Sequence, residues 1–598
     1  MDIREVAAPL SQKRILLEDS YSQFNSQYAH RNRNTVTNKW SATVNNVHTT
    51  ISKYQFWHSS LKKIEGKHGT AIVAYFLLLK WMFFLNLITF VTIFFMITVP
   101  TVVLKDTGDC GENETIVDNE SVTNNFHFAD LFQGTGIMED TALFYGFYPN
   151  RIFCFWSGSN KMYYNLPMVY LSIMILYFLL SWVSIVRSAV KGYQEGLAYK
   201  EDLFYQLGSL IFAGWEFSIQ KENSAKIKHR TLLNEIKATL KSADEIHENK
   251  KMSRIYIIRT CSTIITIIIL GLSGAAIYYT FDYSTRELKS NSEGFLSFIF
   301  QFLPSLCIVC LNMIVPLIFK KIVQFEGYKS QNELNITLYR TIGLRLASLV
   351  VLYYSMYDQI QNNQNIDCWE TFVGQQIYKL LLTDFLTHLF LTFFVNFPRS
   401  LLGQHCNSNN KIVTILTQQN FELNKHVLDV VYSQTLCWFG FFYAPLLSAM
   451  ASIVFFLLFY IKKFNCLVNT IPNAVLYRAS RSNSIFMFVL LISFLFAFLP
   501  FTLSIADITP STTCGPFRGQ NKIWDLVTDL ISTSPNWFQD ISYFVTTAAF
   551  AIPVFLILCL ALYYYTAVNA ANKHMVSYLK HQLLRESRLR QRKDKRNY

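Results

Sequence analysis

The stretch GQQIYKLLLTDFLTHLFLTFFV, residues 374–395, contains the conflict that decides the fold of this chain. It is long and apolar enough to cross a lipid bilayer as one helix, which takes about 20 residues. It nevertheless carries Lys379, Asp384 and His388, and ionisable groups at membrane depth are costly and rarely face lipid. The stretch is therefore predicted to be a membrane span with one side turned toward protein or water.

The polar residues of this span gather on one half of a helix. With 100° between successive residues, that half extends over about 18 Å along the axis, while leucines and phenylalanines fill the other half. We interpret the polar half as one wall of a water-lined groove, and the alternative is a buried polar network that only holds helices together. The polar half comprises Gln376, Lys379, Thr383, Asp384, Thr387 and His388.

Composition extends this interpretation to the whole chain. Of 598 residues, 51% are hydrophobic and only 16% are charged, whereas about a quarter are charged in soluble domains. The chain is therefore predicted to be an all-α polytopic membrane protein with ten transmembrane helices. The seventh and eighth are separated at Pro445, because 35 residues are too many for one span. The ten spans are 69–99, 164–187, 255–279, 295–319, 338–356, 374–395, 427–446, 447–461, 484–503 and 541–567.

Charge indicates the orientation of these spans. The N-terminal region has no apolar signal segment, so we place the N- and C-termini in the cytosol. Lys and Arg then number 40 inside and 7 outside, whereas Asp and Glu number 19 on each side. The predicted inner side carries +21 and the outer side −12, as the positive-inside rule requires. The overall charge of +13 thus reflects orientation and does not indicate nucleic-acid binding.

The predicted outer segments offer modification sites. Asn113 and Asn119 begin glycosylation sequons in the outer loop 104–163. Four cysteines also fall outside, where disulfides form, and sequence alone leaves three pairings or four free thiols open. Our preferred pairs are Cys110 with Cys154, within the first outer loop, and Cys368 with Cys514, between two outer segments. Cys514 lies in the outer loop 504–540.

The predicted cytosolic segments are basic. Residues 1–60 are expected to be largely disordered, and the tail 568–598 is expected to contact anionic lipid. In the loop 188–254, apolar residues recur at helical spacing between charges. That pattern predicts an amphipathic helix that lies on the membrane surface or in a partner's groove, and a plain solvated helix is the alternative. Its apolar face comprises Leu232, Leu233, Ile236 and Leu240.

The fourth span repeats the polar pattern more weakly. Gln301 and Asn312 lie on one side of it, and Pro304 and Pro316 can free backbone carbonyls toward a cavity, although a kinked packing helix would look the same. Arg345, in the fifth span, is expected to extend toward the cytosolic surface. Phosphate-binding loops, zinc-protease motifs and nucleophile elbows are absent from the sequence. We expect no enzyme activity, cofactor or metal ion.

The run Cys368-Trp-Glu-Thr-Phe-Val-Gly-Gln-Gln-Ile-Tyr-Lys-Leu resembles the signature of the transmembrane channel-like family. The likeness covers about residues 60–570 and is closer to the widely expressed members than to the hair-cell members. Other similar runs are Ala74-Tyr-Phe-Leu-Leu-Leu-Lys-Trp, Leu143-Phe-Tyr-Gly, Gly214-Trp-Glu, Arg478-Ala-Ser-Arg-Ser-Asn and Cys514-Gly-Pro-Phe.

The resemblance implies an architecture and partners. It implies the ten-helix architecture of anoctamins and osmosensitive calcium-permeable channels within residues 61–567, a homodimer formed through the tenth helix, and a groove in each protomer between the fourth and eighth helices, 295–461. It also implies a calcium- and integrin-binding EF-hand partner at 188–254 and a small transmembrane auxiliary subunit. The positions that match the family's pore residues are Met313, Asp384, Thr387, His388 and Glu422.

These observations lead to a functional hypothesis with two rivals. We expect the pore-forming subunit of an ion channel in the plasma membrane. The channel is expected to prefer cations because the outer face is acidic, and to open under membrane tension. Gln376 stands where the family commonly has an acid, which leaves Asp384 as the only carboxylate of the sixth span. The rivals are a phospholipid scramblase, which needs a groove that is polar over the full membrane depth, and a non-conducting scaffold.

Overall fold

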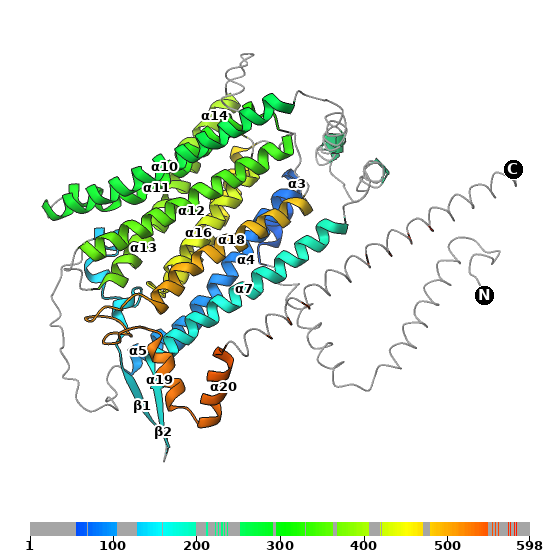
Figure 1. Ribbon diagram of the computed structural model, residues 1–598. Coiled ribbons are helices and arrows are strands. Elements are labelled where there is room, and N and C mark those ends of the chain that lie inside the picture. Colours follow the sequence, from blue (N-terminus) through cyan, green and yellow to red (C-terminus); the bar gives the residue numbers. More distant parts are fainter. Residues whose placement is uncertain are drawn as a thin grey trace, which may run out of the picture.

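The computed structural model describes most of the predicted membrane domain. The described residues are 56–68, 70–104, 128–157, 160–198, 252–290, 295–328, 330–362, 368–405, 419, 421–470 and 479–547, with isolated residues in 208–236 and 553–582. They form a bundle of long helices with one small hairpin at one end (Figure 1). Helices dominate because lipid offers no partners for backbone N–H and C=O groups, which a helix satisfies internally.

Nine long helices make up the described bundle. They are α4 (Thr70–Ile93), α7 (Leu166–Ala198), α10 (Met252–Ser290), α11 (Phe295–Phe325), α12 (Ser330–Asn362), α13 (Trp369–Phe390), α16 (Leu423–Gly440), α17 (Leu447–Phe464) and α18 (Ala479–Ala506). The π-helical turns Phe94–Thr98, Leu391–Asn396 and Asn465–Asn469 continue α4, α13 and α17. The shorter helices are α3 (His58–His68), α5 (Val99–Val103), α6 (Phe128–Gln133), α14 (Phe397–His405), α19 (Asp525–Thr533) and α20 (Asn536–Thr546).

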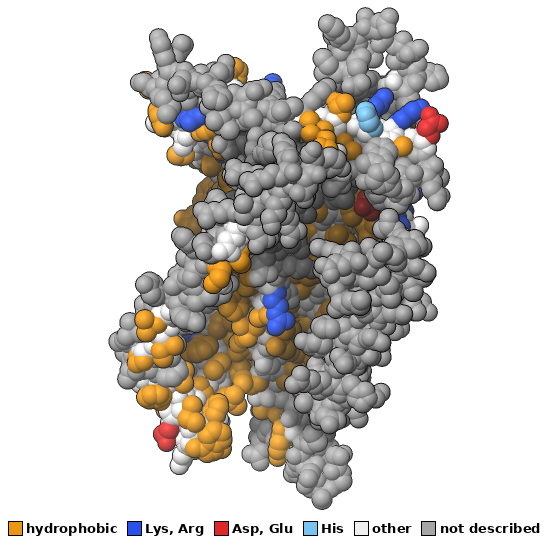
Figure 2. All heavy atoms as spheres, turned by 90° about the vertical axis from the view of Figure 1, so that its right-hand side faces the viewer, with side chains coloured by type: hydrophobic (Ala, Val, Ile, Leu, Met, Phe, Trp, Pro, Cys, Tyr) orange, Lys and Arg blue, Asp and Glu red, His pale blue; other side chains and the backbone are white. Residues whose placement is uncertain are grey.

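The chain is a multi-pass membrane protein. Eight described helical segments are long and apolar enough to cross a bilayer, and each overlaps one of the predicted spans. On the face shown in Figure 2, hydrophobic side chains cover most of the described surface between its two ends. The eight segments are Ile72–Val103, Leu166–Val190, Tyr256–Leu288, Leu296–Phe325, Asn335–Gln361, Trp369–Gly403, Leu447–Asn469 and Phe486–Ala506.

The seventh and eighth spans separate where the sequence predicted. Helix α16 ends at Gly440, and α17 begins at Leu447, so the turn between them contains Pro445. Gly440 lies against Leu447 and Ile377, and there is no room there for a larger side chain. Helix α16 is polar enough to fall outside the eight apolar segments, although it runs through the centre of the bundle.

The tenth predicted span begins differently from the expectation. Residues 541–546 belong to α20, which follows α19 at the end of the bundle that carries the hairpin. Both helices expose large apolar side chains, including Trp537, Phe538 and Ile541. Most of 548–567 lies outside the described residues, so the ten-helix count stays a prediction.

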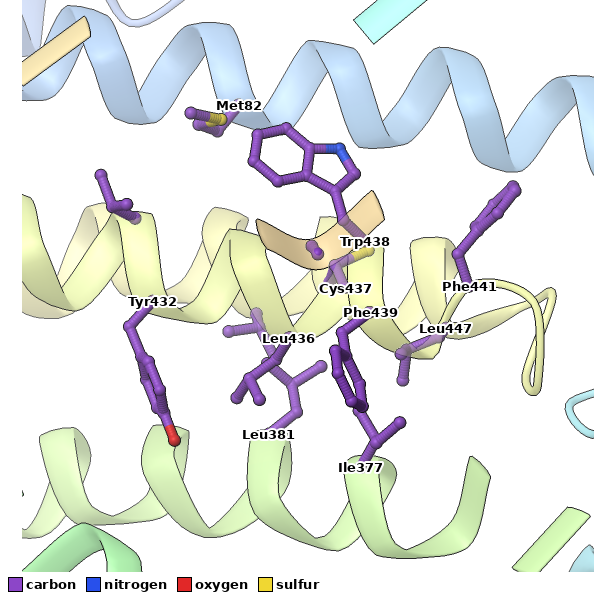
Figure 3. Packing of buried hydrophobic residues seen from close by; sticks show 14 of the residues in the cluster. Met82, Ile377, Leu381, Tyr432, Leu436, Cys437, Trp438, Phe439, Phe441 and Leu447 are labelled. Atoms are coloured by element: carbon purple, nitrogen blue, oxygen red, sulfur yellow. The ribbon is translucent and has the colours of Figure 1, made fainter. Parts of the chain in front are cut away.

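The helices form two groups with a boundary between them. Helices α10, α11 and α12 pack against one another, while α4 packs on α17, and α7 packs on α18. Helices α13 and α16 lie between the groups, because α13 contacts α11 on one side and α16 on the other. In Figure 3, Ile377 and Leu381 of α13 face Leu436 and Phe439 of α16. This boundary is therefore well packed.

The hairpin end of the bundle is closed by a compact cap. Strands β1 (Ile152–Ser157) and β2 (Asn160–Asn165) pair antiparallel. Nearby, the Tyr145 N–H donates to the carbonyl of Tyr443, and the Tyr170 hydroxyl donates to the carbonyl of Phe442 at 2.6 Å. These bonds satisfy backbone groups that the α16–α17 turn leaves free.

A disulfide joins two distant segments of this cap. Cys368, which precedes α13, is bonded to Cys514, as we preferred from the sequence. Beside it, the buried carboxylate of Glu370 accepts the Ser511 N–H at 2.9 Å. The start of α13 is thereby fixed to the segment that follows α18. The other preferred pair, Cys110 with Cys154, involves residues whose side chains lie outside the described part.

We predict that Gly515→Ala destabilises the cap much more than Gly519→Ala. Both glycines have positive φ, +85° and +82°, a conformation that costs an alanine about 1–2 kcal/mol. A Cβ at 515 would also overlap the buried ring of Tyr145, whereas nothing lies within 4 Å of a Cβ at 519. That overpacking adds about 1–3 kcal/mol.

The measurement is the thermal unfolding midpoint of the two detergent-purified variants. We expect a clearly larger decrease for Gly515→Ala. Equal midpoints would contradict the described packing between Gly515 and Tyr145.

Candidate functional site

The candidate site is a cluster of buried charges where α12, α13, α16 and α17 meet. At its centre is Asp429, on the second turn of α16, which is 3% exposed. Its carboxylate accepts a hydrogen bond from Arg345 Nη2 at 2.7 Å and lies 3.4 Å from Lys462 Nζ. One acid thus holds two bases from two other helices, α12 and α17.

Two histidines complete the surroundings of Asp429. The Nδ1 atom of His426 lies 3.6 Å from Asp429 Oδ2 and 2.9 Å from the ammonium group of Lys462. The Nε2 atom of His388 lies 3.8 Å from the same Oδ2. Since the ammonium group of Lys462 only donates, we assign Nδ1 of His426 as the acceptor of this hydrogen bond, which corresponds to the Nε2–H tautomer.

Asp384 brings a second acid to the same place. Its Oδ2 atom accepts a hydrogen bond from the Ser433 hydroxyl of α16 at 3.0 Å, and His388 Nε2 lies 3.8 Å away. We call Arg345, Asp384, Asp429 and Lys462 the charge network. Two bases and two acids give it no net charge while both histidines are neutral. This balance is what allows it to exist away from water, because each unpaired ion there would cost several kcal/mol.

The polar half predicted for the sixth span faces protein. Lys379, Thr383 and Asp384 are buried, and so are Leu381 and Phe385 of the apolar half. Burial therefore does not distinguish the two halves of this helix, and their division stays a prediction. Protein covers Lys379, Thr383 and Asp384 in this structure, and the groove predicted along them stays a prediction.

The remaining predicted residues of α13 serve several roles. Lys379 donates to Gln301 of α11 at 3.5 Å, and Glu139, which belongs to the predicted outer loop, lies near it. Thr383 and Thr387 donate to carbonyls of their own helix at 2.7 Å, which is a common way to satisfy a buried threonine. Gln376 is half-buried.

Residues predicted on other helices are more scattered. Asn312 of α11 is buried, and Met313 beside it is half-buried. Glu422 lies apart from the charge network and forms an exposed ion pair with Lys320 of α11 at 2.7 Å. This pair joins α11 to the start of α16 at the end of the bundle opposite the hairpin. The structure thus gathers Asp384 and His388 in one cluster, whereas Lys379 and Glu422 contact α11 at two separate residues, Gln301 and Lys320.

Sequence reasoning missed the centre of the site. Arg345 was expected to reach the membrane surface, but it is 8% exposed because Asp429 offers it a partner inside the bundle. Asp429 lies within the seventh predicted span, so the rule that identified Asp384 applies to it as well. Lys462 adjoins the end of the eighth predicted span and gave no comparable signal.

Several other predicted site residues lie outside the part of the chain that the structure describes. The sequons Asn113 and Asn119 lie outside the described residues, as does Leu240. Leu232, Leu233 and Ile236 have helical backbone, in agreement with the expected helix in 188–254, and Leu233 is exposed. No partner surface can be assembled from these residues alone.

Comparison with known proteins gives consistent matches. The family model described as the TMC domain matches residues 368–480, which contain α13, α16 and α17. A human protein named voltage-gated chloride channel TMC4 is 30% identical over 93% of this chain and 82% of its own length. Human transmembrane channel-like proteins 5 and 8 are 27% and 28% identical over 93% and 88% of this chain, and over 54% and 75% of their own lengths.

We predict that Asp429→Asn destabilises the protein strongly. The amide leaves Arg345 and Lys462 buried with no compensating charge on α16, and breaking a buried pair costs about 3–5 kcal/mol. The matched control is Glu422→Gln, which breaks an ion pair that is half exposed on both sides and is expected to cost less than about 1 kcal/mol.

The measurement is the thermal unfolding midpoint of each variant in detergent. The charge network would lose its structural role if both variants unfolded at the same temperature.

Proposed function

We propose that this chain, which belongs to the transmembrane channel-like family, forms the pore of an ion channel. The observation that supports this most directly is the charge network, which places two acids and two bases deep among membrane-spanning helices. Ionisable groups in that position are rare and commonly belong to ion pathways. The relative named as a chloride channel, aligned over most of both chains, supports the same activity.

The proposed pathway follows α11, α13 and α16. It enters between Lys379 and Gln301, reaches Asp384 about 7.5 Å farther along α13, and leaves beside the Lys320–Glu422 pair. Because Lys379 and Asp384 are buried, ions reach them only when α11 moves away from α13. The two contacts at the ends of the pathway are single polar interactions and are weak enough to break in such a movement.

Cation preference is the selectivity we expected from the sequence, and it remains our prediction. The predicted outer side carries −12, and Asp384 lies on the polar half of α13. A neutral charge network cannot strengthen this preference greatly, since Arg345 and Lys462 balance its acids. The proposed channel is therefore weakly selective.

Chloride conduction is the second candidate, and a separate observation favours it. Lys379 adds a third buried base beside the proposed pathway. Two relatives, from human and mouse, carry the name voltage-gated chloride channel TMC4 and are each 30% identical to this chain. The sign of the reversal potential in a salt gradient distinguishes the two candidates.

Other properties expected from the sequence also stay proposals. They are opening by membrane tension, a homodimer in the plasma membrane with cytosolic termini, glycosylation at the two sequons, and the EF-hand and auxiliary partners. A scramblase would move labelled lipid in the vesicles that are used for current measurements, and a scaffold would be silent in both assays. Phe390 at the end of α13 and Phe394 in the following π-helical turn are exposed. They interrupt the continuous polar surface that a lipid headgroup needs to cross the membrane.

We predict that Asp384→Asn shifts selectivity toward anions. The change removes one negative charge beside the proposed pathway. At an effective dielectric constant near 20, a unit charge 4 Å away contributes about 4 kcal/mol, so even partial screening allows a change of about fivefold or more in the cation-to-chloride permeability ratio. The control is Asp529→Asn, which neutralises an exposed acid on α19.

The measurement is the reversal potential of the purified protein in planar bilayers under a KCl gradient, with lipid flipping recorded on matched vesicles. Wild-type current without flipping would support the channel. Unchanged reversal potential in Asp384→Asn would remove Asp384 from the pathway, and flipping without current would favour the scramblase.

A further inference from the structure

Several buried polar atoms beside the charge network have no hydrogen-bond partner among the described residues. They are Arg345 Nε, the Tyr432 hydroxyl and both terminal atoms of the Asn312 amide. The three side chains belong to α12, α16 and α11, and each residue is at least nine-tenths buried. Leaving such atoms unsatisfied costs about 1–3 kcal/mol each, so a buried group of them calls for a ligand or water.

These atoms belong to one place in the bundle. The guanidinium carbon of Arg345 lies 5.3 Å from the ring centre of Tyr432. The hydroxyl of Tyr432 lies in turn near the side chains of Asn312 and Ser348. Figure 3 shows Tyr432 extending from α16 toward α13, on the opposite side of α16 from Trp438. Three helices thus contribute polar groups near the place where α11, α12, α13 and α16 meet.

The chemistry of these groups restricts what can bind. The Nε–H of a guanidinium only donates, and it cannot accept a hydrogen bond or coordinate a metal cation. The Tyr432 hydroxyl and the Asn312 amide nitrogen are donors as well, and the amide can rotate to present either end. A ligand that satisfies all three must offer lone pairs in several directions. A bare metal cation has none to offer, whereas a halide ion has them on every side.

We propose that a halide anion, chloride under physiological conditions, binds between Arg345, Tyr432 and Asn312. The Nε–H, the hydroxyl and the amide NH₂ donate to it. The inference rests on the second candidate of the proposed function, chloride conduction, because it makes this a binding site for the permeating ion. The proposal assigns an anion-binding role to Arg345, Tyr432 and Asn312. From the sequence, only Asn312 was predicted as a pore residue, and no anion site was predicted.

The surrounding charges make this site weak, as a permeation site must be. Arg345 keeps its bond to Asp429 through Nη2, so its Nε remains available. Lys462 adds a second positive charge, but Asp429 and Asp384 repel an anion by the same amount. Affinity therefore comes from three short-range hydrogen bonds and not from net charge. Binding in the millimolar range lets the ion enter and also leave.

The test is chloride-dependent stability of the full-length protein in detergent. The unfolding midpoint is followed while NaCl replaces sodium gluconate at constant ionic strength, so that only the anion changes. A ligand that binds the folded state raises the midpoint, and we expect a saturable rise of about 2 °C for the wild type. Bromide should replace chloride in this effect.

Two variants remove single donors without removing bulk. Tyr432→Phe keeps the ring beside Arg345, and Asn312→Leu keeps the branched shape of the side chain. Each loses a hydrogen bond to an ion, so each should need about tenfold more chloride for half of the rise. The matched control is Tyr354→Phe, which removes the hydroxyl of an exposed tyrosine on α12 and should behave as the wild type.

Each outcome bears on one proposal. A chloride-specific rise that is weakened only in Tyr432→Phe and Asn312→Leu supports the site. The absence of a rise, or an equal rise in all variants, overturns it and leaves water as the partner of these atoms. Current recorded from the same preparation decides the proposed function separately, since a channel without this site still conducts, and a non-conducting protein can still bind chloride.

Discussion

The carboxylate of Asp429 is the constraint on which the centre of this structure depends. It lies in the membrane domain with a guanidinium on one oxygen and an ammonium near the other, and these come from helices that are 84 and 33 residues away in the sequence. An ion pair of this kind gains little stability over apolar packing, but it is costly to break from one side. It therefore fixes how α12, α16 and α17 are arranged, and it does so more specifically than leucine and phenylalanine contacts do.

Once these three helices are placed, the position of α13 follows from its own polar half. Asp384 needs a donor, and Ser433 of α16 supplies one a single turn beyond Asp429. The start of α13 is held independently by the disulfide and by the Glu370–Ser511 bonds. The helix is therefore fixed at the hairpin end and at mid-depth, while its far end continues through a π-helical turn with exposed phenylalanines. Any movement of α13 relative to α11 must occur with these two points held.

Much of the fold could be predicted because membrane insertion imposes simple rules. Length and apolarity identified the eight described spans, Pro445 identified the break before α17, and the cost of a charge in lipid identified Asp384 as a group that faces protein. What could not be predicted was which helices are neighbours, because periodicity gives the direction of a side chain but not its partner. Arg345 illustrates the point, since it looks like a residue that reaches the surface until Asp429 is known to be near it. Tyr432 gave no signal at all, because a tyrosine among apolar residues is ordinary in a core.

The strengths of the contacts between the two helix groups indicate where the bundle opens most readily. Arg345 and Asp429 join α12 to α16 through a buried bond, and separating them would leave two unpaired ions at several kcal/mol each. Lys320 and Glu422 join α11 to α16 through a pair that is half exposed, and water replaces each partner at a cost below about 1 kcal/mol. The polar contact between Lys379 and Gln301, which lies in the packed interface of α11 with α13, is long at 3.5 Å. The difference favours a motion in which α12 stays with α16 while α11 moves away from α13. That motion would expose Lys379, Asp384 and Asn312 together, which are the residues that an ion must meet along the proposed pathway.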